Sequence, residues 1–129
     1  MAAAEAAHLP PCVPTKIIAV HLNHRSRVAE FRATLPAAPT YFHKPVSALV
    51  GHGGAVVRPA NCRYLNYEGE VAIVIGLACR NVSPASAGEY IAGYTTANDF
   101  GPHDFRDTDA GSMLRVKART RWRRSAPGW

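Results

Sequence analysis

The chain has 129 residues, of which 47% are hydrophobic, and this length and composition suit a single globular domain. Ten Gly and ten Pro residues favour a loop-rich fold with β-strands over a helix bundle. No apolar run reaches the roughly 18 residues that a membrane helix needs. The N-terminus also lacks the basic region of a secretory signal, so we expect a cytoplasmic protein without membrane contact.

The three cysteines, Cys12, Cys62 and Cys79, are odd in number and show no C-x-x-C spacing. This pattern argues against a disulfide framework and against a zinc site, and indicates free thiols in or near the core.

The net charge of +6 comes mainly from the C-terminus, because residues 1–116 carry ten basic and nine acidic side chains. A basic tail with two Trp residues could bind nucleic acid through phosphate contacts and stacking. The nearly neutral body argues against a nucleic-acid partner, and the alternative is a solvated terminus.

The N-terminal third combines a tail, a strand and a short helix. Residues 1–15 are rich in Ala and Pro and are expected to be disordered. The β-branched run at 16–22 predicts a buried strand. Apolar residues at helical spacing predict a short helix or lid-like segment over 23–35. Those residues are Val28, Phe31 and Leu35, with Asn23 or Ser26 as the candidate N-cap.

The rest of the chain indicates short strands with one more helix. Residues 36–45 are punctuated by Pro and extended, and 47–59 read as strand, glycine turn and strand. Residues 63–76 give the strongest strand signal. Ser83 and Pro84 predict the start of a helix that runs to about Ala92, and a strand follows over 93–99. The mixture predicts a β-rich α+β fold.

Two acidic residues stand out because Glu68 and Glu70 are two apart on the predicted strand. Such residues point to one face, about 6.5–7 Å apart. Each carboxylate raises the pKa of the other unless a cation neutralises them. Oxygen ligands suit Mg²⁺, Ca²⁺ or Mn²⁺, and Asp99 at the end of the next strand could complete the site. The alternatives are a solvated sheet edge and a turn-forming Asp.

The order and spacing of three segments resemble the fumarylacetoacetate hydrolase family. These segments are KIIAVHLNHRSRVAEF, YFHKP and NYEGEVAIVIGLACRNVSPASAGEYIAGYTTANDFGPHDFR. The resemblance covers residues 16–117 and implies the N-terminal part of a β-rich roll with a metal site at its mouth. It also implies an enzyme, a homodimer in the intact family member, and a small-molecule 2-oxo acid as substrate.

The resemblance assigns roles residue by residue. Glu68, Glu70 and Asp99 fall on the ligands of a divalent cation, Mg²⁺ or Mn²⁺, and Lys117 falls on the active-site lysine. His103 and Arg106 fall on substrate-contacting positions, and an Arg suits a carboxylate. Lys44 matches a family motif without an assigned chemistry.

The resemblance also assigns a water-activating pair in the lid. Glu30 falls on the acid of this His–Glu dyad, but Arg27 stands where the family has its His. His24, three residues earlier, could substitute as the catalytic base.

The presence of Arg27 at the position of the family's His makes some reactions more expected than others. The implied cation stabilises an enolate, which serves double-bond shift, decarboxylation or C–C cleavage, and only hydrolysis needs a base for water. We therefore expect an isomerase or decarboxylase of 2-oxo or 2-hydroxydienoic dicarboxylic acids in the catabolism of aromatic compounds. The alternatives are an acylpyruvate or fumarylacetoacetate-type hydrolase, and an inactive fragment.

Residues 118–129 depart from the resemblance and form a basic tail. A neighbouring reading frame of a GC-rich gene could encode the family-like continuation GADTLAPLGARL. We therefore expect this tail to be a frameshift product and the 16–117 domain to be partial.

Overall fold

The computed structural model describes residues 9–105 and 113–118 and shows a β-rich α+β fold with mainly antiparallel strands. Its elements are β1 (Ile17–His21), α1 (Arg25–Glu30), β2 (Thr40–Lys44), η2 (Val46–Ala48), β3 (Leu65–Asn66), β4 (Gly69–Ile75), η3 (Ala87–Tyr90), β5 (Ile91–Asn98), β6 (Gly101–Pro102), η4 (His103–Phe105) and α2 (Leu114–Lys117). Three predictions lie outside the described residues: the structure of residues 1–8, the role of Arg106, and the basic tail from residue 119. No described helix is long and apolar enough to cross a membrane.

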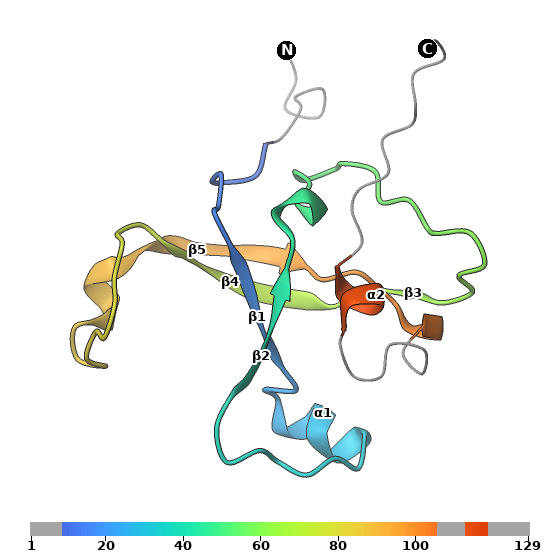
Figure 1. Cartoon of the computed structure of the whole chain (residues 1–129), viewed down its shortest axis with the longest axis horizontal. Coiled ribbons are helices and arrows are strands. Elements are labelled where there is room, and N and C mark those ends of the chain that lie inside the picture. The colour runs from blue at the N-terminus through green and yellow to red at the C-terminus, as the bar shows by residue number, and fades with distance from the viewer. Residues whose placement is uncertain (1–8, 106–112, 119–129) are drawn as a thin grey trace.

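The strands form three antiparallel ladders, β1–β2, β3–β6 and β4–β5. In Figure 1 the β1–β2 hairpin runs across the β4–β5 hairpin, while β3 and α2 lie beyond one end of β4. The predicted strand 16–22 is confirmed as β1, although Ile18 in it is 55% exposed, so the strand is half-buried. The predicted strand 93–99 is confirmed as β5, which begins two residues earlier.

The predicted strand 63–76 is in fact two strands, β3 and β4. β3 pairs with β6, whereas β4 pairs with β5, and the chain changes partner between Asn66 and Gly69. The prediction was wrong here because an apolar run does not reveal which partner each part will meet. The predicted strands in 47–59 are also wrong, since this segment has the end of η2, one turn at 52–53 and otherwise irregular chain.

The two predicted helices are shorter than expected. α1 spans only six residues, begins after His24 rather than Asn23 or Ser26, and has no side-chain cap. The helix predicted from Ser83 is a turn followed by the short 3-10 helix η3, although Ser83 Oγ accepts the Ser86 N–H at 3.3 Å. Short helices need tertiary packing, and only Val28 of α1 is buried.

The described residues bury few apolar side chains: Val28, Cys62, Pro102 and Val116. One face of the β4–β5 hairpin is open, because Ile73 and Tyr94 are opposite each other in the ladder and are 56% and 67% exposed. Apolar packing is therefore concentrated at a few points rather than along the sheet.

The segment before β3 is held to η4 by one carboxylate. Asp104 accepts the backbone N–H groups of Arg63 and Tyr64, the latter at 3.0 Å. The Tyr64 N–H, then the Arg63 N–H and the Cys62 thiol, lower the pKa of Asp104 from its ordinary value. Burial, and then Asp104 itself, raise the pKa of the Cys62 thiol.

Truncation of Val116, which is 1% exposed, should destabilise the fold. We expect Val116→Ala to lower the free energy of unfolding by about 2 kcal/mol through lost burial and a residual cavity. Ile73→Thr, on the open face, should change it by less than about 0.5 kcal/mol. Urea unfolding measures both, and equal effects would contradict this distribution of packing.

Asp104→Asn should destabilise the fold in a pH-dependent way. The pKa of Asp104 is lower in the folded chain, so its ionised form stabilises the fold above its unfolded pKa. This contribution is lost as the pH falls through the folded pKa. We expect wild type to exceed Asp104→Asn in stability at neutral pH and the difference to shrink below about pH 4. Unfolding curves over this range test it, and a pH-independent difference would refute the role of the charge.

Candidate functional site

The β4–β5 ladder places two carboxylates opposite each other. Gly69 pairs with Asn98, and one step further the Asp99 N–H donates to the Glu68 carbonyl at 2.9 Å. The Glu68 N–H in turn donates to Asn98 Oδ1 at 3.0 Å. Because opposite residues of an antiparallel pair share a face, Glu68 and Asp99 point to the same side. Glu70 lies two residues further along the chain, inside β4, and the strand period predicts the same face for it.

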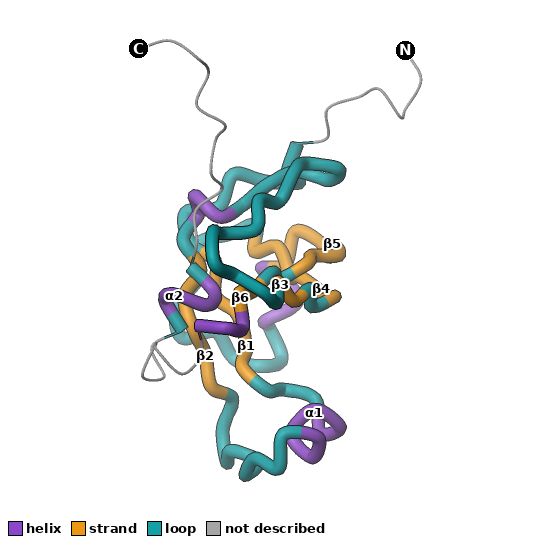
Figure 2. The backbone as a smooth tube through the Cα atoms, turned by 90° about the vertical axis from the view of Figure 1, so that its right-hand side faces the viewer, coloured by secondary structure: helices purple, strands orange, loops and turns teal. Residues whose placement is uncertain are grey.

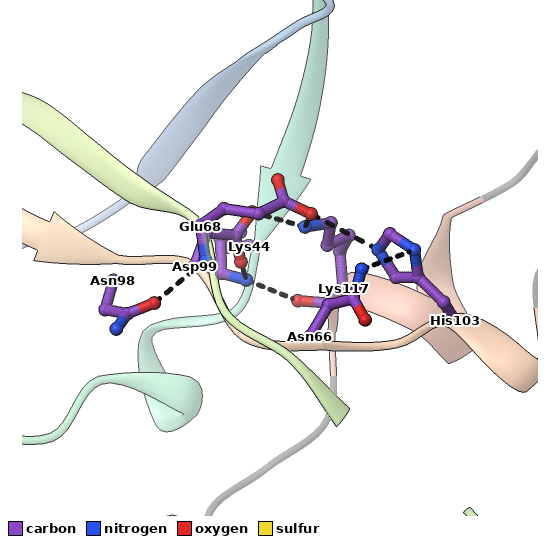
Figure 3. A network of polar contacts seen from close by, with 7 residues as sticks. All are labelled: Lys44, Asn66, Glu68, Asn98, Asp99, His103 and Lys117. Carbon is purple, nitrogen blue, oxygen red and sulfur yellow. Dashed lines mark hydrogen bonds and ion pairs between the residues drawn. The ribbon is translucent and has the colours of Figure 1, made fainter. Parts of the chain in front are cut away.

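The helix α2 brings the ammonium of Lys117 between these carboxylates (Figure 3). Lys117 Nζ lies 2.7 Å from Glu68 Oε1 and 3.1 Å from Asp99 Oδ2. Both Lys117 and Asp99 are buried, at 4% and 8% exposure. Gly101 in β6 leaves room for the lysine stem, since a Cβ there would lie 3.3 Å from Lys117 Cδ and Cε.

A second lysine, Lys44 at the end of β2, enters the same cluster. Its ammonium forms an ion pair with Asp99 Oδ1 and donates to the Lys117 backbone carbonyl at 2.8 Å. Strand β2, the end of β5 and α2 therefore meet at one polar point, which has two carboxylates and two ammonium groups.

His103 lies beside Glu68 and is oriented by Asn66. His103 Nδ1 is 3.1 Å from Asn66 Nδ2, and Nε2 is 3.2 Å from Glu68 Oε1. An amide NH₂ only donates, so Nδ1 accepts and Nε2 carries the proton that faces Glu68. His103 can thus orient the Glu68 carboxylate.

The surroundings of Glu68 favour its ionised form. Burial alone would raise the pKa of Glu68, but the Lys117 ammonium and then His103 outweigh burial and lower this pKa below its ordinary value. The carboxylate is therefore ionised at neutral pH.

The structure brings together four of the residues predicted from sequence: Glu68, Asp99, Lys117 and His103. Glu70, in β4, is exposed. Among residues 9–105 and 113–118, no three Asp, Glu, His or Cys side chains are gathered closely enough to form a preassembled metal cluster.

The proposed lid residues His24 and Glu30 are not part of the cluster. They lie at α1, at the opposite end of the β1–β2 hairpin from the polar cluster, as Figures 1 and 2 show. Arg27 forms an exposed ion pair with Glu30 on this helix. Arg27 Cζ also lies 4.8 Å from the centre of the Phe31 ring.

Two contributors had no role assigned from sequence. Lys44 belonged to a noted motif, but its contact partners are 55 and 73 residues away in the chain. Asn66 lies in the short strand β3, which the apolar pattern of the sequence does not separate from β4. Both contacts depend on the tertiary arrangement, which no local pattern of the sequence reveals.

Replacement of Lys117 by Met should raise the pKa of Glu68, because the ammonium is the main group that favours its ionised form. Carbon-detected NMR titration of the Glu68 carboxyl measures this pKa directly. An unchanged or lower pKa in Lys117→Met would contradict the ion pair.

Comparison with known proteins gives a consistent family. Residues 16–127 match the model of the fumarylacetoacetate (FAA) hydrolase C-terminal domain. An uncharacterised protein of Archaeoglobus fulgidus is 42% identical over 110 residues, which is 85% of this chain and 44% of that protein. The homoprotocatechuate catabolism bifunctional isomerase/decarboxylase of Escherichia coli is 39% identical over 103 residues, which is 80% of this chain and 24% of the enzyme.

The fold is also similar to solved structures of this family. The structure matches the crystal structure of 5-carboxymethyl-2-hydroxymuconate delta-isomerase from Mycobacterium smegmatis with a TM-score of 0.78 and 36% identity. The match covers 92% of this chain and 47% of the isomerase. The chain thus spans less than half the length of these relatives, which include enzymes, and it belongs to the fumarylacetoacetate hydrolase family.

Proposed function

We propose that this chain carries the cation-binding part of an isomerase or decarboxylase that acts on dicarboxylic 2-oxo or 2-hydroxydienoic acids. The observation that supports this most is the convergence of Glu68 and Asp99 on one cationic nitrogen. The names of the enzyme from E. coli and the isomerase from M. smegmatis point to the same reaction class.

The donor chemistry of the site fits a hard divalent cation. Two carboxylate oxygens face the Lys117 ammonium, so the protein already stabilises positive charge at this position. Oxygen ligands are those that Mg²⁺ and Mn²⁺ prefer. Glu68 and Asp99, with Glu70 from the same face, would hold such a cation.

The proposed chemistry divides between the cation and the side chains. Bound here, a divalent cation would supply Lewis-acid polarisation of a 2-oxo group. Lys117 would hold a proton at its Nζ next to the reacting carbon skeleton. His103, with its proton on Nε2, would keep Glu68 oriented.

The hydrolase alternative is less supported, because the Glu30 carboxylate is already paired with Arg27. Water attack would need a free base, and His24 is the remaining candidate on this segment. Acylpyruvate cleavage that is present in wild type and lost in His24→Ala would reverse this order.

The cation site can be tested without turnover. We expect an electron paramagnetic resonance titration to show one Mn²⁺ bound per chain, and Glu68→Gln or Asp99→Asn to weaken binding at least about tenfold, since each removes a carboxylate ligand. Glu70→Gln should weaken it too. Glu89→Gln, which removes an exposed carboxylate in η3, should leave the affinity unchanged.

Absence of Mn²⁺ binding by wild type, or equal losses in Glu89→Gln, would contradict the site. The reaction class needs a separate assay, in which the chain with Mg²⁺ is given 2-hydroxyhepta-2,4-dienedioate and an acylpyruvate. Consumption of the dienoate supports the proposal. Metal binding without any turnover would identify an inactive member.

A further inference from the structure

We infer that Lys44 is a positioning residue of this site, which fixes both Asp99 and Lys117 so that they face Glu68. The relevance of Lys44 to cation binding rests on the proposed function. The contacts that Lys44 makes with Asp99 and Lys117 are those of described residues. Lys44 has no role in the function proposed above.

The two lysines bind different oxygens of the Asp99 carboxylate. The Lys44 ammonium forms its ion pair with Oδ1, while Oδ2 lies 3.1 Å from Lys117 Nζ. A carboxylate that is free to rotate would present either oxygen. With Oδ1 held, Oδ2 and Glu68 Oε1 are directed to the same position, as Figure 3 shows.

Lys44 also holds the end of α2. Its ammonium donates to the Lys117 carbonyl at 2.8 Å, among the last carbonyls of this four-residue helix. Such carbonyls lack helical partners, and a lysine commonly satisfies them. Helix α2 is too short to be stable alone, so this bond helps to fix the backbone from which the Lys117 side chain extends.

The location of Lys44 makes it a firm anchor. It ends β2, where it pairs with Ile17 in the β1–β2 ladder, and its side chain is 16% exposed. Outer partners that orient metal ligands typically change affinity about 10–100-fold when removed. A lysine beside a cation site also repels the cation, so positioning and repulsion predict changes of opposite sign.

The test compares Lys44→Met, Lys44→Arg and Lys16→Met with wild type. Lys16→Met is the matched control, because Lys16 is exposed and directly precedes the strand that pairs with Lys44. The first measurement is Mn²⁺ affinity by electron paramagnetic resonance. The second, which needs no metal, is the rate at which an amine-reactive acylating reagent modifies Lys117, read by mass spectrometry.

We expect Lys44→Met to weaken Mn²⁺ binding at least about tenfold and to speed modification of Lys117. Lys44→Arg keeps donors for both acceptors and should restore both values, and Lys16→Met should change neither. Circular dichroism checks the fold. Should Lys44→Met fail to fold, Lys44→Gln is measured in its place, with the same expectations.

Two results would overturn the inference. Tighter Mn²⁺ binding in the uncharged variant would show that Lys44 acts only as a competing charge. Wild-type values for both measurements would show that it positions nothing. If wild type binds no Mn²⁺, the proposed function fails, and the modification rate of Lys117 alone decides whether Lys44 positions it.

Discussion

Two carboxylates placed opposite each other on one sheet face need positive charge between them, and the rest of this structure follows from that need. The β4–β5 register brings Glu68 and Asp99 together. Their mutual repulsion is offset by lysines from elements distant in sequence, Lys117 of α2 and Lys44 of β2. The polar cluster thus ties the ends of three elements, and the candidate chemistry lies at that junction.

The fold depends strongly on the contacts of this polar cluster, because few apolar side chains are buried elsewhere. Few apolar side chains are buried in the described part of the chain, namely Val28, Cys62, Pro102 and Val116, and one face of β4–β5 is open. A buried ion pair contributes little net stability as a whole, but removal of one partner commonly costs about 3–5 kcal/mol. Loss of either lysine would therefore leave the buried Asp99 carboxylate with less compensating positive charge.

The sequence predicted the parts of the fold that depend on local pattern. The strands at β1 and β5 and the family resemblance could be read from spacing and motif, whereas the shared face of Glu68 and Glu70 stays a prediction. The division of 63–76 into β3 and β4 could not, because it depends on which strand each half meets.

In the site, too, the contacts that follow from local strand patterns were predictable, and those between segments far apart in the chain were not. The alignment of Asp99 with Glu68 was expected on condition that their strands pair, which they do. Lys44 and Asn66 were missed as members of the cluster, since their contacts join segments 37 to 73 residues apart. The burial of Lys117 was equally hidden, because a lysine in a basic C-terminal segment gives no local sign that a glycine of β6 will make room for it.

In the proposed function, Glu68 and Asp99 share one cation position, which the Lys117 ammonium occupies in this structure. A crystal structure of the chain grown with Mn²⁺ tests it most directly through anomalous scattering. We predict a manganese peak at bonding distance from both carboxylates, with Lys117 Nζ moved away from them. A peak elsewhere, with the lysine still between the two carboxylates at saturating Mn²⁺, would contradict it.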